Sequence, residues 1–527
     1  MLSNFPLILF FNCWAAGIFY FSLKYTRWGY VINLSFICLL FFLTFPTHFD
    51  FDLFFQMAGR YFFPLAIINF CLNERINKPN SANSRKYRIN ASLAKGYIKI
   101  RDIRRGVSII GSAGSGKTES VVAHFLQHFS RHSFCGIIHD YKNFELSKIA
   151  YPLFKKSNVP FYMISFDTIY NRVNPIAPRY MQNVESVNEI SRLLLENLLE
   201  KKEDFSGGSS KFFNDAAEGI IGGLIWKLKT DYPRFCTLPH LIGFYQHAST
   251  YQLVNFLNSN LTSQAMANAF LGGVESERQT ASVKSTLSNA FKKISSKNIF
   301  MVLSTDEIPL DINNPEKPGV ISVVNNPKFE SAYSPIIATI IHTITKQMSV
   351  HEKLPSFILM EEAPTIRLLN MHRIPATLRS YNISTVYVMQ DKIQNDMLYG
   401  DKASKAILSN LSYQFFGKVN DPDTAKYYER FFEIVKRESI SISKSENLNF
   451  DTRITRSERE VSKIRADLFF RLKPGEFVSF ADGKEQKIKF GIPSLRKELP
   501  IPKQKFSEQD LDDNFEKIYR EAQSIIE

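Results

Sequence analysis

Cysteine is scarce in this chain of 527 residues, and its placement excludes the common metal and disulfide patterns. The five cysteines are Cys13, Cys38, Cys71, Cys135 and Cys236. No two of them have C-x-x-C spacing, and none has histidine partners close by in the sequence. We therefore predict neither a zinc site nor a disulfide framework, and we expect reduced thiols. Internal repeats are also absent.

Charge is sparse in the first 72 residues, where three apolar runs cover residues 5–23, 30–45 and 53–72. The first two runs are uncharged and of membrane-spanning character, whereas the third contains Gln56 and Arg60, so it either spans a bilayer or lies at its surface. We expect two or three spans. Basic residues follow the third run, which places the rest of the chain in the cytoplasm under either topology. No Lys or Arg precedes the first run, so no cleaved signal peptide is expected.

Acidic residues are outnumbered by basic ones, and the formal net charge is +14. Residues 1–78 hold five basic and three acidic groups, or +2, so the remainder carries about +12. The positive excess therefore belongs to the part outside the apolar runs, where a polyanion such as nucleic acid is a plausible partner. The length predicts two to four domains.

A phosphate-binding loop is the most specific motif present. It consists of Gly111, Ser112, Ala113, Gly114, Ser115, Gly116, Lys117 and Thr118, which fit G-x-x-x-x-G-K-[ST] at every fixed position. An apolar run, 107–110, precedes it, and a helix-compatible stretch, 119–128, follows, as the motif requires. Glycines let backbone N–H groups surround phosphate oxygens, Lys117 is expected to reach the β- and γ-phosphates, and the Thr118 hydroxyl is expected on Mg²⁺.

Strand-like and helical patterns alternate on both sides of a long helical stretch. Short apolar runs at 134–139 and 159–165 predict strands, and further strands are predicted at 318–324, 357–360, 384–389, 413–416 and 477–480. Between them, residues 183–295 have apolar positions at helical spacing and few strand-like runs. The pattern predicts an α/β domain with a parallel sheet, interrupted by a mostly helical insertion.

Two carboxylates complete the predicted nucleotide site. The apolar run 357–360 leads directly into Glu361 and Glu362. A strand that ends in carboxylates is typical of the second half of such a site, with Glu361 acting on Mg²⁺ and Glu362 polarising the attacking water. Most such sites place Asp first, and an ordinary charged strand end is the competing interpretation.

Gln390 and Arg379 extend this site. Gln390 ends the predicted strand 384–389, so its amide should emerge at the same sheet edge and sense the γ-phosphate. Arg379 lies just before that strand, where it is either a solvated helix residue or an arginine finger for a neighbouring subunit.

Together these residues resemble the type IV secretion coupling proteins, the TraG/TraD type of membrane-bound conjugation ATPase in the FtsK/HerA-like superfamily. The resemblance runs from about Tyr97 to Lys489. Besides the motifs above, it includes Asp140-Tyr-Lys142, Asn174-Pro175, Leu378-Arg379-Ser380-Tyr381, Tyr399-Gly400, Asp423-Thr424-Ala425 and Lys473-Pro-Gly-Glu476. This sequence departs from the family pattern at Glu361 for Asp, Tyr141 for Pro and Asn382 for Gly.

The resemblance implies a RecA-like P-loop NTPase domain with an inserted all-α domain, preceded by N-terminal transmembrane helices. The expected order is an anchor (1–75), a linker (76–96), the first part of the nucleotide-binding domain (97–182), the all-α domain (183–295), the second part (296–490) and a C-terminal tail (491–527). It further implies ATP and Mg²⁺ as cofactors, a hexameric ring at the bacterial inner membrane, and relaxosome and secretion-channel proteins as partners.

Three functions remain open from the sequence. The first is an ATPase that drives conjugative transfer of DNA held by a relaxase, with Lys292-Lys293 and Lys297, or Lys436-Arg437 and residues 453–465, as candidate DNA contacts. The second is a receptor ATPase that hands protein substrates to the channel. The third is a non-conjugative DNA translocase of the same superfamily.

Overall fold

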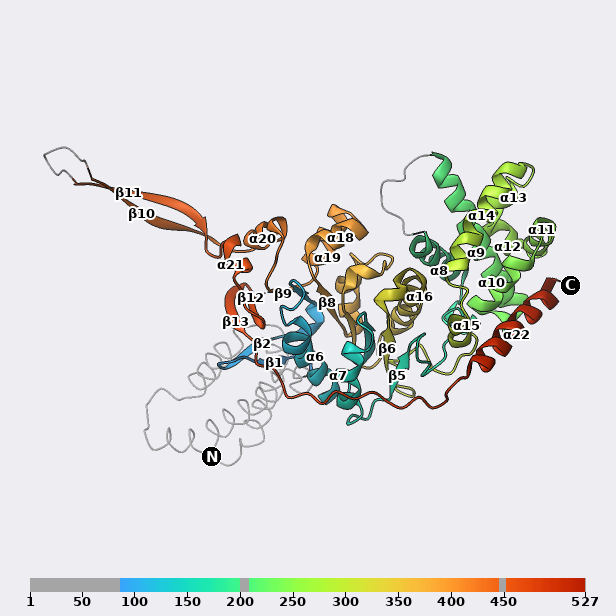
Figure 1. Ribbon diagram of the computed structural model, residues 1–527, viewed down its shortest axis with the longest axis horizontal. Coiled ribbons are helices and arrows are strands. Elements are labelled where there is room, and N and C mark those ends of the chain that lie inside the picture. The colour runs from blue at the N-terminus through green and yellow to red at the C-terminus, as the bar shows by residue number, and fades with distance from the viewer. Residues whose placement is uncertain (1–85, 200–207, 445–451, 527) are drawn as a thin grey trace, which may run out of the picture. The chain divides into compact units, whose positions relative to one another are not determined.

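The computed structural model describes residues 86–199, 208–444 and 452–526, and the predicted transmembrane anchor lies outside these ranges. Its centre is a nine-stranded sheet in the order β13-β12-β9-β3-β8-β7-β4-β6-β5 (Figure 1). The seven strands from β9 to β5 are parallel, and the β12–β13 hairpin adds antiparallel to β9. The strands are β3 (Val107–Ile110), β4 (Cys135–Asp140), β5 (Phe161–Ile164), β6 (Val320–Val324), β7 (Ser356–Met360), β8 (Ile383–Met389), β9 (Tyr413–Phe416), β12 (Glu476–Ala481) and β13 (Lys484–Lys489). All seven strands predicted from apolar runs are confirmed.

The sheet is buried on both faces, because successive side chains along its parallel strands point alternately into two apolar cores. Ile109, Ile138 and Val388 face one core, which α6 (Ala123–Arg131) and α7 (Glu145–Phe154) cover. Their sequence neighbours Ile110 and Met389 belong to the other core, which α16 (Glu330–Met348) covers. This two-sided burial explains why these strands appear in the sequence as short continuous apolar runs.

In the described part of the chain between β5 and β6, helices run from Val184 to Leu303, so they cover the predicted insertion, 183–295, and continue past its expected end. They are α8 (Val184–Leu198), α9 (Gly208–Asp231), α10 (Leu238–His247), α11 (Thr250–Asn258), α12 (Leu261–Met266), α13 (Asn268–Leu271), α14 (Glu277–Lys293) and α15 (Lys297–Leu303). Asn183 caps α8 by accepting the Ser186 N–H, so the helical region begins where the sequence predicted. These helices gather beyond the β5 edge of the sheet (Figure 1).

Short helices connect the later strands. They are α17 (Ile374–Leu378), α18 (Lys392–Tyr399), α19 (Asp401–Ser409), α20 (Pro422–Glu429) and α21 (Ala466–Phe470). An antiparallel pair, β1 (Ile89–Ser92) and β2 (Tyr97–Ile100), precedes the phosphate loop.

The C-terminal segment joins two distant regions of the fold. From β13 the chain runs past α7, where the Glu498 N–H donates to the Lys148 carbonyl at 3.0 Å, and continues to the helical region (Figure 1). There α22 (Glu508–Ile526) packs on α10 and α15, burying a stripe of Leu511, Ile518, Ala522 and Ile525. The predicted helix near Ser507 is confirmed, and its apolar stripe explains why it docks.

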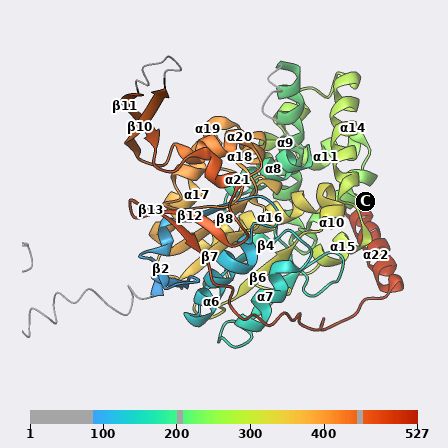
Figure 2. The ribbon, with the colours of Figure 1, turned by 60° about the vertical axis from the view of Figure 1, so that its left-hand side comes forward.

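A two-stranded ribbon corrects the secondary structure expected near residue 440. β10 (Ile434–Lys444) and β11 (Thr452–Ser462) pair antiparallel over eleven residues each, where no strand was predicted. The ribbon extends away from the nine-stranded sheet in both views (Figures 1 and 2). Its sequence is polar and rich in Ser, Arg and Glu, so it lacks the apolar run by which the other strands were recognised. Within the described ranges, no helix has both the length and the apolar character needed to cross a bilayer.

Candidate nucleotide site

The phosphate loop connects β3 to a helix at the carboxyl edge of the parallel sheet. Its first residues are fixed by neighbouring strands, because the Gly111 N–H donates to the Met389 carbonyl at 3.2 Å and the Ser112 N–H to the Lys418 carbonyl at 2.7 Å. Gly114 and Gly116 have φ angles of 74° and 87°, in a region that glycine adopts readily and other residues avoid. The following helix begins at Lys117 with a π-helical turn and continues as α6, so the predicted helix is confirmed.

A second loop supports the phosphate loop from outside. The Gly475 N–H donates to the Ser115 carbonyl at 2.9 Å. A Cβ atom on Gly116 would lie 2.8 Å from the Gly475 nitrogen, so only glycine fits there. Gly475 itself has φ 79°. The segment Lys473–Glu476, which sequence reasoning could give only as family-like, therefore has a physical task in holding the loop.

Lys117 is folded onto its own loop. Its ammonium lies 2.5 Å from the Gly111 carbonyl oxygen and 3.3 Å from that of Ser112. The side chain is buried, and burial lowers its pKa. Because the Ser112 and Gly111 carbonyls are weak partners for a buried cation, the ammonium is available to a stronger anion such as phosphate.

The carboxylates at the end of β7 lie against this loop. The Thr118 hydroxyl donates to Glu361 Oε1 at 3.2 Å. Glu361 is almost fully buried, and His139, on the adjacent β4, contacts the Glu361 backbone carbonyl at 2.9 Å. Burial, with a smaller contribution from the Asp140 carboxylate, raises the pKa of Glu361 to about 8. A buried carboxylate of this kind favours the approach of a cation.

Glu362 has an unusual backbone and two side-chain partners. Its φ and ψ are 44° and 53°, a left-handed conformation that costs a non-glycine residue about 1–3 kcal/mol. Its Oε1 accepts the Gln390 amide at 3.1 Å and lies 3.2 Å from the Lys142 ammonium. Gln390 follows β8, so the predicted meeting of Gln390 with the carboxylates at one sheet edge is observed.

Arg379 lies elsewhere. It precedes β8, whereas the phosphate loop and Gln390 follow β3 and β8 at their carboxyl ends. Its guanidinium is half exposed and lies 3.8 Å from Asp102. The chain therefore does not bring Arg379 to its own phosphate loop.

The residues present fit a nucleotide and magnesium. The Ser115 hydroxyl and Glu361 Oε2 are buried without a hydrogen-bond partner in the described part of the chain, and buried polar groups normally have one. Hydroxyl and carboxylate oxygens, as on Thr118 and Glu361, are the ligands that Mg²⁺ prefers. The first N–H groups of the helix starting at Lys117 have no acceptor within that helix and suit phosphate oxygens.

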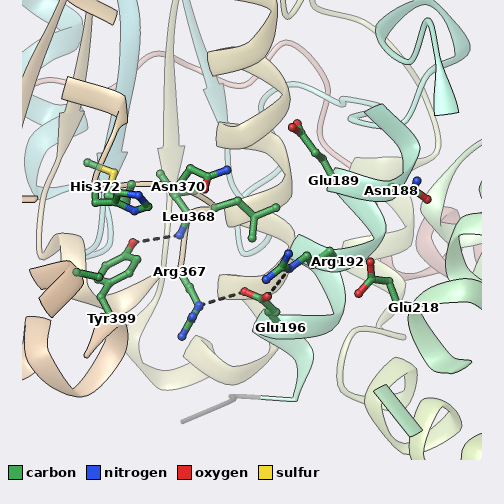
Figure 3. Close-up of a pocket in the computed structure, with 13 residues that line it drawn as sticks. Asn188, Glu189, Arg192, Glu196, Glu218, Arg367, Leu368, Asn370, His372 and Tyr399 are labelled. Atoms are coloured by element: carbon green, nitrogen blue, oxygen red, sulfur yellow. Dashed lines mark hydrogen bonds and ion pairs between the residues drawn. The ribbon is translucent and has the colours of Figure 1, made fainter. Parts of the chain in front are cut away.

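Two cavities lie near these elements. One, of about 400 Å³, borders the phosphate loop and is lined by Ser112, Ala113, Gln390, Asp391, Val419, Asn420, Asp421 and Pro422. The other, of about 450 Å³, lies between α8 and residues 367–372 (Figure 3). There Glu196 bridges Arg192 at 2.8 Å and Arg367 at 3.1 Å. The first cavity adjoins the predicted nucleotide site. Beside the second, the Glu196 ion pairs connect the helical region to the segment that follows Glu362.

Sequence reasoning missed one functional side chain, Lys142. It was noted only within the family-like Asp140-Tyr-Lys142, yet its ammonium contacts both Glu361 and Glu362. The available signal was its place two residues after a parallel strand adjacent to β7, since the carboxyl ends of parallel strands share an edge.

A parallel sheet with a glycine-rich loop after β3, and carboxylates after β7 that meet its threonine, defines the class of P-loop NTPases. A profile of the family described as type IV secretory system conjugative DNA transfer matches residues 73–488. The chain belongs to this family and is a type IV secretion coupling protein for conjugative DNA transfer.

Solved structures agree with this fold. The unbound bacterial conjugative coupling protein TrwBdeltaN70 superimposes with a TM-score of 0.61 at 13% identity, covering 80% of this chain and 92% of that one. TrwB with the ATP analogue ADPNP gives 0.57 at 13% identity, covering 75% and 87%. TrwB with ADP and Mg²⁺ gives 0.57 at 13% identity, covering 76% and 87%. No curated protein sequence matches the chain.

Proposed function

We propose that this coupling protein is a motor ATPase that uses ATP and Mg²⁺ to drive or license the transfer of relaxase-bound DNA into a type IV secretion channel. One observation carries the proposal. The Thr118 hydroxyl at the end of the phosphate loop donates to Glu361 Oε1, 243 residues away, while Gln390 contacts the adjacent Glu362. The residues proposed for hydrolysis thus lie together at one sheet edge.

Each residue has a distinct proposed task. The loop from Gly111 to Thr118 holds the phosphates through backbone N–H groups and Lys117, and Thr118 with Glu361 holds Mg²⁺. Magnesium held by these residues would supply positive charge against the charge that develops on the phosphate oxygens. Glu362 accepts the proton of the attacking water, and its hydrogen bond from Gln390 fixes the carboxylate and links it to the end of β8.

Arg379 is proposed as an arginine finger in a ring, most simply a hexamer. Its support is positional, because it lies at the amino end of β8, opposite its own phosphate loop, and is half exposed. An arginine so placed can reach a nucleotide only across a subunit boundary. Its Asp102 contact is long, so little energy is needed to release it.

The anchor, linker, split nucleotide-binding domain and all-α domain are proposed with the boundaries given above, with one correction. The linker, expected over 76–96, ends before β1, because Ile89 and Ala91 are buried in the core of the nucleotide-binding sheet. Residues 1–75 are proposed to hold the protein in the bacterial inner membrane with its ATPase domain in the cytoplasm. The three apolar runs of the sequence and the basic residues that follow them are the grounds for this location. The all-α domain, residues 183–295, is proposed to receive relaxosome proteins.

The β10–β11 ribbon is the better of the two candidate DNA contacts. Lys297 is already paired with Asp512 of α22, and Lys293 donates to the Leu198 carbonyl. In the ribbon, alternate register pairs share a face. One set consists of Val435–Val461, Arg437–Arg459, Ser439–Ser457, Ser441–Thr455 and Ser443–Arg453, with three arginines and no acid. The other set contains all three glutamates of the two strands, Glu438, Glu458 and Glu460. The acid-free set suits a phosphate backbone.

The proposal is tested by ATP hydrolysis and by transfer. Purified full-length protein should hydrolyse ATP, faster with single-stranded DNA, and Lys117→Ala should abolish both hydrolysis and conjugative transfer in cells. Lys148→Ala, an exposed lysine on α7, is the control and should retain both. Transfer that persists at the wild-type frequency with Lys117→Ala would refute a motor role. A protein-receptor function would instead show hydrolysis stimulated by relaxase alone and not by DNA.

A further inference from the structure

Lys142 lies beside the proposed catalytic carboxylates but has no role in the reaction proposed above. It follows β4, which lies between β7 and β6 in the parallel sheet, so it emerges beside the carboxylates that follow β7. Its ammonium lies 3.2 Å from Glu362 Oε1 and 3.8 Å from Glu361 Oε1. Among the described residues, only the Lys142 ammonium lies within 4 Å of both the Glu361 and the Glu362 carboxylate.

The backbone around Lys142 is built to hold it there. The next two residues, Asn143 and Phe144, both have left-handed φ angles, 47° and 72°. Such an angle is rare for a bulky aromatic residue. Phe144 is nevertheless buried against Met163 and Val324, and the Asn143 N–H donates to the Asn325 carbonyl at 3.2 Å. Packing therefore maintains a strained turn whose result is the placement of Lys142 over the carboxylates.

When Glu361 loses its proton, two buried carboxylates lie together and need a counter-charge in the absence of a metal. The side chains of Glu361 and Glu362 are only 1% and 3% exposed, whereas Lys142 is 35% exposed. A buried pair of carboxylates without a cation is costly. Because Lys142 is partly in solvent, it can leave without itself becoming a buried, unpartnered charge.

The Glu361 oxygen that Lys142 approaches is also the one that accepts the Thr118 hydroxyl. Thr118 and Glu361 are the proposed magnesium ligands, so the lysine and the metal would share the Glu361 carboxylate, whose Oε2 has no other partner in the described part of the chain. We propose that Lys142 is a built-in counter-ion that competes with the divalent cation for Glu361 and withdraws toward Glu362 when the metal binds. This inference rests on the proposed metal site.

Competition predicts an unusual result for substitution. Lys142→Gln should strengthen the binding of a divalent cation in the absence of nucleotide. The Lys142 ammonium repels a divalent ion close to Glu361, and Coulomb energy scales with charge, so its removal should raise the affinity for the ion about tenfold.

The test measures Mn²⁺ binding to nucleotide-free, full-length protein by electron paramagnetic resonance at pH 8. Lys142→Gln should bind Mn²⁺ about tenfold more tightly than the wild type, Lys142→Arg should bind as the wild type does, and Lys148→Gln serves as the matched surface control. A Lys142→Gln variant that folds, by circular dichroism, but binds Mn²⁺ no more tightly than the wild type overturns the inference.

Glu361→Gln separates the two proposals. It should lose the Mn²⁺ site if Glu361 is a metal ligand. If Glu361→Gln binds Mn²⁺ like the wild type, the proposed metal site is wrong and the inference about Lys142 fails with it. If Glu361→Gln loses the site while Lys142→Gln gains nothing, only the role of Lys142 is rejected.

Discussion

The Thr118 hydroxyl donates to Glu361 Oε1 at 3.2 Å, across 243 positions of sequence. Parallel strands bring the two residues together, since β3 and β7 are separated in the sheet only by β8, and the residues that follow such strands share one edge. The helical insertion between β5 and β6 lengthens the chain between them without disturbing this edge. The contact joins the two halves of the proposed nucleotide site.

Gly475→Ala should weaken ATP binding several-fold. A Cβ there meets nothing closer than 3.9 Å, so the cost is the left-handed φ of 79°, about 1–2 kcal/mol. Relief of this strain would shift the N–H that supports the Ser115 carbonyl. Gly483→Ala is the matched control, because Gly483 has φ 74° and open space but lies in the β12–β13 turn. Calorimetric titration with a non-hydrolysable ATP analogue should separate the two variants, and equal affinities would contradict a supporting role for Gly475.

Much of this site follows from the sequence because its parts are local. The phosphate loop, Glu361-Glu362 and Gln390 each end a short apolar run, and a parallel sheet then dictates that they meet. Lys142 follows β4, so the parallel sheet also brings it to this edge, but its contact with the carboxylates further depends on the strained turn at Asn143-Phe144. Gly475 could not be assigned in the same way, because it lies in a loop from the antiparallel edge of the sheet, whose position no local periodicity encodes. The ribbon escaped prediction because its two strands contain no continuous apolar run.

The C-terminal helix α22 should detach when a charge is placed in its buried stripe. The Ala522 Cβ lies close to Gly243 of α10, where an added Cβ would be 3.1 Å away, so a larger residue has no room. Ala522→Asp should cost about 2 kcal/mol or more through desolvation and overpacking. Limited proteolysis should then release residues near 500–527, whereas Gln523→Asp, at the exposed neighbouring position, should stay protected. Equal resistance of both variants would contradict the docking of α22.

Acid should destabilise the protein through His128. Burial lowers the pKa of His128 to about 4, and its Nε2 lies 2.6 Å from the Lys86 carbonyl. The unfolded chain, with a histidine pKa near 6.5, binds the proton more tightly, so stability is lost as pH falls from about 6.5 to 4. At pH 5 this histidine should account for about 2 kcal/mol. His128→Gln should reduce the loss of thermal stability between pH 7 and pH 5, and an unchanged loss would exclude His128 as a source.

Arginines in the acid-free register set of the ribbon should account for part of the salt dependence of DNA binding. Replacing Arg437, Arg453 and Arg459 by Gln should lower the slope of log affinity against log salt by about 2, at about 0.7 per phosphate contact on single strands. The other set offers a control of equal charge change, Lys436→Gln, Lys444→Gln and Arg456→Gln. If both triple variants lower the slope equally, DNA does not distinguish the two faces.

The most direct test of the central claim is single-turnover ATP hydrolysis by Glu362→Gln, compared with ATP binding by the same variant. Glu362 is proposed to accept the proton of the attacking water, while the phosphate loop and Glu361 hold the nucleotide and metal. The account predicts that Glu362→Gln binds ATP within a few-fold of the wild type but hydrolyses it at least 100-fold more slowly, as expected for loss of a general base. Hydrolysis at the wild-type rate, with binding intact, would contradict the proposed site.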